Sequence, residues 1–256
     1  VCRCGDRMLT KLRYEGKPTF VFPIGTGPLR PAVEAIREFA RFKGYPMTLR
    51  GITETHREML EAEYPGAFEY SEDVDCADYI YSAEKLSTYS GKALHGKKNH
   101  CNRFEAEHDW DFVPLTRELI PGCLDMLNMW TEENYARLDG SIHYEHDAIM
   151  RAFAVYEKLG LEGGVLRSGG KIIGFSMGEM AGRDTFDVHF EKADIDINGA
   201  YPMVCRELTR MVMQNHPELL YMNREDDMGL ESLRTSKLSY KPEFMVRKFT
   251  ARMRDE

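Results

Sequence analysis

The sequence lacks the features that mark secreted, disulfide-linked and membrane-spanning proteins. Its six cysteines form no C-x-x-C pair and follow no regular spacing, so they indicate reduced thiols and not a disulfide framework. No apolar run approaches the roughly 18 residues that cross a bilayer, and no signal or transit peptide is visible. We therefore expect a globular, cytoplasmic protein without integral membrane contact.

An excess of positive charge is also missing. The formal net charge is −8 at pH 7, which provides no general attraction to DNA or to anionic lipid. Two segments, 92–103 and 234–254, are nevertheless locally basic. Each is either a solvated face of a helix or edge strand, or a local site for tRNA or a lipid headgroup.

Length and composition favour two domains of ordinary size. The chain has 256 residues, of which 43% are hydrophobic and 30% charged, as in typical globular proteins. Strands and helices alternate loosely in the first part as they do in the second. We predict a first unit over 1–110, ending in a basic joining helix, and a second unit over 111–256 that carries the donor site. We expect the first unit to continue before Val1.

The stretch 163–248 has the clearest pattern. Segment 185–193 (TFDVHFEKA) alternates apolar with polar residues, the period of a half-buried strand. Gly199 then precedes apolar residues at helical spacing, so it marks a strand-to-helix turn whose backbone N–H groups can hold an anion. The elements expected in order are strands 163–167, 171–180 and 185–193, a helix after Gly199, strand 219–222, helix 229–237 and strand 241–252.

Two helices before a hairpin, then strand, turn, helix, strand, helix and strand, is the element order of the GNAT acyltransferase fold. The segments YIYSAEKLSTYSGKALHGKKNHCNRF, VHFEKAD, NGAY and NREDDMGLESLRTSKLSYKPEF resemble the family that contains the C-terminal catalytic domain of phosphatidylglycerol lysyltransferases, relatives of the Fem aminoacyltransferases. The resemblance covers about 22–248. It implies an α+β fold of two tandem, duplicated GNAT-like units, each with a mixed central sheet flanked by helices.

The resemblance also implies an acyltransferase that moves an aminoacyl or other acyl group to a small amine or hydroxyl acceptor. The donor is then a co-substrate, either aminoacyl-tRNA or a CoA thioester, and no tightly bound cofactor is expected. An acyl-CoA-dependent N-acetyltransferase and a non-catalytic binding or regulatory module are the alternatives.

Glu191 and His189 are the candidate proton acceptors. Strict alternation places both on the same side of strand 185–193 as Asp187, near the end at which such folds open their cleft. A carboxylate there can take a proton directly or through water if partial burial raises its pKa. The alternative is that these polar residues form the solvent face of the strand.

The turn of Gly199, Ala200 and Tyr201 is the candidate site for a donor anion. In CoA-dependent GNAT enzymes a Q/R-x-x-G-x-G/A signature holds the pyrophosphate at this turn, and only its end is present here. Asp194 and Asp196 would repel a pyrophosphate. This departure weakens the CoA interpretation and fits the resembled family, whose characterised members take the aminoacyl group from tRNA.

Asn223, Arg234 and Lys237 are the remaining candidates. Asn223 ends the strand before the last helix. In ordinary GNAT enzymes a Tyr near the end of that helix protonates the leaving thiolate. Aligning Leu233 and Tyr240 with the family pattern puts Arg234 at that position. An arginine is no acid at neutral pH, but it binds phosphate or carboxylate bidentately. We therefore predict that Arg234 and Lys237 bind an anion or the oxyanion.

An acidic run, Glu225 to Asp227, precedes the same helix. Carboxylates are favoured at a helix N-terminus, and they can also recognise a cationic acyl or acceptor group such as a lysyl amine. Both uses are compatible.

His143 and His146 have an H-x-x-H spacing. A zinc site needs further ligands placed by the fold, which spacing alone does not supply, so no metal site is predicted.

Overall fold

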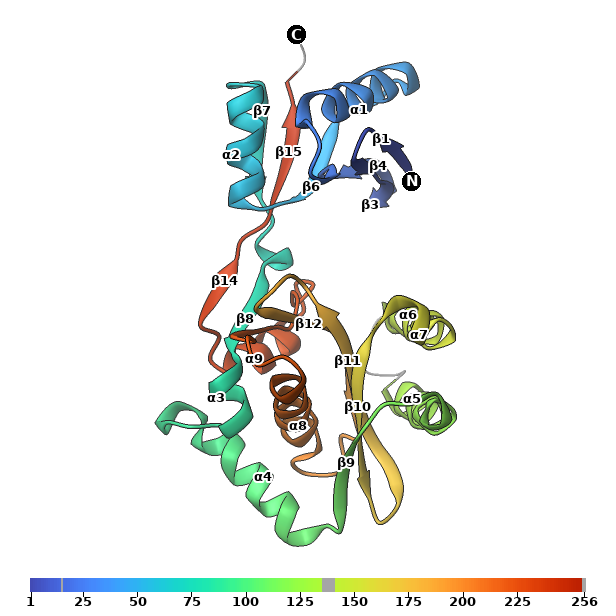
Figure 1. Cartoon of the computed structure of the whole chain (residues 1–256), viewed down its shortest axis with the longest axis vertical. Coiled ribbons are helices and arrows are strands. Elements are labelled where there is room, and N and C mark those ends of the chain that lie inside the picture. The colour runs from blue at the N-terminus through green and yellow to red at the C-terminus, as the bar shows by residue number, and fades with distance from the viewer. Residues whose placement is uncertain (15, 135–140, 255–256) are drawn as a thin grey trace. The chain divides into compact units, whose positions relative to one another are not determined.

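The computed structural model describes residues 1–14, 16–134 and 141–254 (Figure 1). The chain forms two compact units. Unit 1 comprises Val1–Asp78, Asp226–Glu231 and Met245–Glu256, and unit 2 comprises Tyr79–Glu225 and Ser232–Phe244. This division differs from the predicted 1–110 and 111–256, because residues 79–110 pack with the second unit and the C-terminal strand pairs within the first.

Unit 1 contains a five-stranded sheet in the order β3-β4-β6-β15-β7 and a small sheet in the order β1-β2-β5. β4 runs parallel to β6, whereas β15 runs antiparallel to both of its neighbours. The strands are β1 (Cys2–Cys4), β2 (Arg7–Leu9), β3 (Lys11–Tyr14), β4 (Lys17–Val21), β5 (Ile24–Gly25), β6 (Thr48–Ile52), β7 (Phe68–Glu72) and β15 (Phe249–Met253).

Two helices cover the core of unit 1, α1 (Leu29–Lys43) and α2 (Glu54–Glu63). α1 buries Val33, Ile36 and Ala40, whose spacing of three and four residues puts them on one helical face. It ends at Gly44, whose φ of 72° is the left-handed conformation that glycine adopts without a Cβ clash. Apolar spacing and a glycine stop therefore define this helix.

Unit 2 contains a seven-stranded sheet in the order β14-β8-β13-β12-β11-β10-β9. β12 pairs with β13 in parallel, while β9, β10, β11 and β12 form an antiparallel array. These mixed sheets confirm the predicted α+β class. The strands are β8 (Asp78–Ser82), β9 (Trp110–Pro114), β10 (Glu162–Ser168), β11 (Lys171–Met180), β12 (Thr185–Ala193), β13 (Tyr221–Asn223) and β14 (Phe244–Val246).

The helices of unit 2 lie on both faces of its sheet. α8 covers one face, where Val204 approaches Gly174 of β11, and α5 to α7 cover the other around a core that includes Phe175 and Met177 (Figure 1). α4 packs along α8. The helices are α3 (Ala83–Thr88), α4 (His95–Glu107), α5 (Ile120–Asn134), α6 (Ser141–Ala154), α7 (Tyr156–Leu159), α8 (Ala200–Asn215) and α9 (Glu231–Ser239).

β12 has two irregularities that decide where its side chains point. Its parallel pairing with β13 ends at Asp187 opposite Asn223, although β12 continues to Ala193, so the two strands part beyond that point. Against β11, Val188 pairs with Gly178 and Phe190 pairs with Met177, which leaves His189 as the extra residue of a β-bulge.

The end of the chain corrects one prediction. We expected a single strand over 241–252, but the structure has two short strands, and β15 joins the sheet of unit 1 between β6 and β7. Apolar alternation predicts a strand without saying which sheet edge it will meet, because that pairing is non-local. Among the described residues, no helix has both the length and the apolar character that spanning a bilayer requires.

Candidate functional site

The bulge at His189 separates the two proposed proton acceptors. Phe190 packs against the core under α5 and α6, and Glu191 stands opposite Ser176 with its carboxylate at Arg224. The prediction that Glu191 shares a side of the strand with Asp187 and His189 is therefore wrong. One inserted residue shifts the alternation, so residues 187 and 191 face opposite sides of the sheet.

His189 is surrounded by carboxylates. Its Nδ1 lies 2.9 Å from Glu225 Oε1 and its Nε2 lies 3.2 Å from Glu179 Oε1. One oxygen of Asp187 lies within 4.8 Å of both the Glu225 oxygen and the imidazole. We call Glu179, Asp187, His189 and Glu225 the carboxylate–histidine cluster. With three acidic side chains around one imidazole, the cluster as a whole has a net negative charge.

The cluster changes the protonation of its histidine. The hydrogen bond to Glu225 raises the pKa of His189 to about 9, with a further contribution from Glu179, while partial burial opposes the rise. His189 is thus an imidazolium at neutral pH. It can donate a hydrogen bond or a proton there, but it is not a free base.

A cavity of about 270 Å³ adjoins this cluster. Its lining combines apolar side chains with two carboxylates and the imidazole. Such a cavity suits a ligand with an aliphatic body and a positively charged end. The lining residues are Ala152, Leu159, Leu161, Glu179, His189, Phe190 and Glu225.

The ligand atoms of Asp187, His189 and Glu225 are close enough together to surround a cation. Both imidazole nitrogens of His189 already face carboxylates, however, so we assign no metal to this group. His146 of the H-x-x-H motif does not belong to this group of potential ligands. His146 hydrogen-bonds Asn128 at 2.9 Å, and the side chain of His143 lies outside the described residues.

Arg224 occupies the region where β12 and β13 part. Its Nη2 lies 2.7 Å from Glu191 Oε1, and its guanidinium carbon lies 4.5 Å from the ring centre of Tyr240 and 5.7 Å from that of Tyr81. Lys97 of α4 places its ammonium 3.8 Å from the Tyr240 ring centre. We call these five residues the arginine–tyrosine cluster. Glu191 is therefore held in an ion pair and is not a free carboxylate.

Lys237 and Asn223 hold the chain between the two clusters. The Lys237 ammonium donates to the carbonyl oxygens of Arg224 and, at 3.3 Å, of Glu225. Asn223 Oδ1 accepts from the Glu225 N–H at 2.8 Å, and Glu225 has a φ of 54°. Lys237 was predicted to bind an anion, but its ammonium is engaged by backbone oxygens. The two side chains stabilise a left-handed turn that points Arg224 and Glu225 to different clusters.

The predicted donor turn is covered by α4. A Cβ at Gly199 would lie 2.7 Å from the backbone oxygen of His100, and Asn198 Oδ1 lies 2.7 Å from His100 Nδ1. The Ala200 N–H already bonds to Ile197 O at 3.1 Å, and Pro202 has no N–H. The helix N-terminus is therefore not the open cradle that a pyrophosphate needs.

The remaining candidates are dispersed. Tyr201, beside Trp130 and the Ala193 backbone, is a weak acid because burial raises its pKa to about 12. Arg234 is half-buried on α9, three residues before Lys237. Its role in anion binding stays a prediction.

Sequence reasoning missed Glu179, Arg224 and the inward position of Lys97. Arg224 directly follows Asn223 within the NRED motif, and its place in that motif could have identified it as a candidate site residue. Nothing local marks Glu179, because its approach to His189 depends on the pairing of β11 with β12. Of the acidic run, Glu225 joins the cluster, whereas Asp226 and Asp227 accept backbone N–H bonds from Met228 and Gly229.

Comparison with known proteins identifies relatives of the whole chain. The family described as phosphatidylglycerol lysyltransferase, C-terminal, matches residues 2–252. An uncharacterized protein of Mycoplasmoides gallisepticum is 28% identical over 179 residues, which are 69% of this chain and 56% of that protein. The chain thus spans about half the length of this curated relative.

Solved structures show the same architecture. A conserved protein of unknown function from Bacteroides thetaiotaomicron matches with a TM-score of 0.91 and 34% identity, over 98% of this chain and 84% of that one. L-PGS from Bacillus licheniformis matches with a TM-score of 0.67 and 16% identity, over 98% and 82% of the two chains. FemX matches with a TM-score of 0.63 and 9% identity, over 98% and 86%. A tandem GNAT protein from the clavulanic acid biosynthesis pathway matches with a TM-score of 0.51 and 10% identity, over 99% and 82%. The last three likenesses concern the fold alone, and they confirm the predicted tandem GNAT-like fold.

Proposed function

The chain belongs to the phosphatidylglycerol lysyltransferase C-terminal family, and on that premise we propose that it transfers an aminoacyl group from tRNA to an amine or hydroxyl acceptor. Family and fold are those of GNAT-like acyltransferases. The proposal adds that the carboxylate–histidine cluster holds an ammonium of the aminoacyl group, while the cavity beside it holds the aliphatic part.

One observation carries this proposal: acidic and apolar side chains line the same cavity of about 270 Å³. Glu179 and Glu225 supply negative charge, and Leu159, Leu161 and Phe190 supply apolar surface. A lysyl group has the matching distribution, because its ammonium ends an aliphatic chain. An acetyl group has no charge for the carboxylates to bind, so the cluster would contribute nothing to its recognition.

The covered turn argues in the same direction. A CoA donor needs backbone N–H groups free to hold its pyrophosphate, and α4 lies against Gly199. The 3′ end of a tRNA delivers its aminoacyl ester without a pyrophosphate at that position. This geometry favours the aminoacyl donor over the alternative of an acyl-CoA-dependent N-acetyltransferase.

In the proposed reaction the acceptor nitrogen or oxygen attacks the ester carbonyl of the donor. A C–N or C–O bond forms, the ester bond to the ribose breaks, and the proton lost by the acceptor ends on the ribose hydroxyl. The His189 imidazolium already faces Glu225 and Glu179 with its two nitrogens, so its proposed role is to hold these carboxylates in place and not to act as the base predicted from the alternation.

The test compares donors in which one amine of the lysyl group is either free or acetylated. Lysyl-tRNA and lysyl-tRNA acetylated at either amine are incubated with the protein and hydroxylamine as acceptor, and the hydroxamate is measured. We expect acetylation at the recognised amine to slow transfer about tenfold, which corresponds to about 1.4 kcal/mol for one charge-assisted contact. Glu225→Gln should slow the lysyl donor and remove most of this difference.

Glu162→Gln is the matched control, because Glu162 also contacts a histidine, His216, away from the cavity. It should leave the donor preference unchanged. Equal rates for charged and acetylated donors would contradict the proposal. Transfer from acetyl-CoA, together with a rise in Tm on adding CoA, would establish the CoA alternative. No transfer from either donor would support a binding module.

A further inference from the structure

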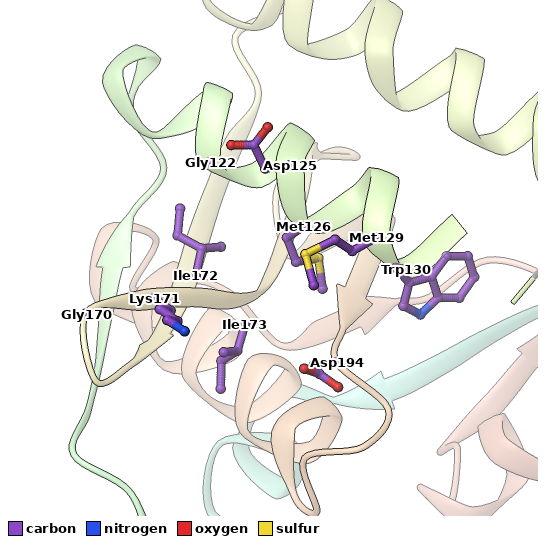
Figure 2. A pocket seen from close by; sticks show the side chains of 10 residues that line it. All are labelled: Gly122, Asp125, Met126, Met129, Trp130, Gly170, Lys171, Ile172, Ile173 and Asp194. Atoms are coloured by element: carbon purple, nitrogen blue, oxygen red, sulfur yellow. The ribbon is translucent and has the colours of Figure 1, made fainter. Parts of the chain in front are cut away.

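A second and larger cavity of unit 2 lies between α5 and the start of β11. Its volume is about 400 Å³, the size of a small-molecule site. Figure 2 shows the side chains of Met126 and Met129 reaching from α5 toward Ile172 and Ile173, with Trp130 at one end. The walls are therefore mainly apolar, and two of them are flexible thioethers that adapt to a ligand's shape.

The charged residues of this cavity are mostly acidic. Asp125 lies on one side and Asp194 on the opposite side in Figure 2, and Lys171 is the basic lining residue. Asp194 is held in place, because its Oδ1 accepts from the Asp196 N–H at 2.9 Å and its own N–H donates to Ile173 O at 2.8 Å. A fixed carboxylate beside apolar walls selects a cation over an anion.

The indole at the end of the cavity is also fixed. Lys192, 8% exposed, places its ammonium 3.8 Å from the Trp130 ring centre and 2.8 Å from Glu145. Tyr201 lies beside the same indole. Trp130 is thus a rigid wall that a ligand does not have to order on binding.

We propose that this cavity binds a primary amine carried on an apolar body, with its ammonium at Asp194 and its body against Met126, Met129 and Trp130. The geometry favours an amine over an anionic ligand, since an anion would face two carboxylates.

The binding test uses Trp130 as its own reporter. The chain has two tryptophans, so in a Trp110→Phe background the fluorescence comes from the cavity. Hexylammonium, hexanol and hexanoate share one body and differ in charge. We expect hexylammonium to change the fluorescence at about fivefold lower concentration than hexanol, as one partly exposed ion pair allows. Hexanoate should bind more weakly than either.

Asp194→Asn should make hexylammonium and hexanol bind at the same concentration. Asp125→Asn, at a second and exposed position, should weaken the preference for hexylammonium over hexanol. Asp196→Asn removes the same charge two residues away without lining the cavity, so it should keep the preference. Equal binding of the three probes, or an unchanged preference in both cavity variants, would overturn the proposal. No donor or turnover enters this measurement, so its failure leaves the test with charged and acetylated donors standing.

Discussion

Arg224 Nη2 and Glu191 Oε1 lie 2.7 Å apart where β12 and β13 have parted, and the next residue, Glu225, reaches the other cluster at His189. A left-handed turn at Glu225 allows adjacent side chains to serve different sites. The ion pair thereby fixes the backbone that presents Glu225. The predictions below separate the structural role of Arg224 from the binding role of its neighbour.

Breaking this ion pair should be costly. The side chains of Arg224 and Glu191 are 13% and 9% exposed, so Glu191→Met leaves a guanidinium charge with little solvent. We expect a loss of about 3–5 kcal/mol in the free energy of unfolding, measured with urea. The double variant with Arg224→Met should be more stable than Glu191→Met alone. Additive losses would show that the two side chains do not interact.

Arg103 and Glu107 on α4 supply an exposed control. Their side chains are 62% and 49% exposed, and the pair spans one helical turn. Glu107→Met should change the unfolding free energy by less than about 1 kcal/mol. A similar loss for both pairs would mean that burial does not account for the cost at Arg224.

His189 should titrate well above an ordinary histidine. NMR of the imidazole should give a midpoint near pH 9 in the native protein, and Glu225→Gln should move it toward 6.5. A raised native pKa means that the protonated form stabilises the fold. This contribution is complete below pH 6.5 and is lost as the pH rises through about 9. Glu162→Gln should leave the midpoint unchanged, and a native midpoint near 6.5 would contradict the cluster.

Lys237 should act on Glu225 through the backbone. Lys237→Met removes the donor to two partly buried carbonyl oxygens, so we expect a loss of about 1–3 kcal/mol in stability and a lower pKa for His189. The pKa change is the informative readout, because general destabilisation would not move it. Lys85→Met, which removes an exposed ion pair with Glu243, is the control and should leave the His189 pKa unchanged.

Gly199 should not tolerate a side chain. Gly199→Ala combines a φ of 93° with a Cβ placed 2.7 Å from His100 O, so α4 must shift. Gly182→Ala has a φ of 113° but no atom within 4 Å, and it isolates the backbone strain of about 1–3 kcal/mol. We expect Gly199→Ala to lower Tm further than Gly182→Ala. Equal effects would show that α4 does not press on the turn.

Local pattern was sufficient for most elements of unit 2. Alternating residues and glycine turns predicted strands 171–180 and 185–193 with the bounds that the structure has, and apolar spacing predicted the helix after Gly199. The same alternation misplaced Glu191 relative to His189. A β-bulge depends on how β12 meets β11, and a single strand's sequence does not reveal it.

By itself, the sequence determined the α+β class, the order of elements in unit 2 and the family, because these depend on short-range periodicity and on motifs such as NRED. Only the tertiary structure decided that β15 belongs to the sheet of unit 1, that Glu179 and Glu225 meet at His189, and that α4 covers the turn at Gly199. Each of these joins segments far apart in the chain. Such contacts depend on which helices and strands pack together, and local sequence patterns do not specify that packing.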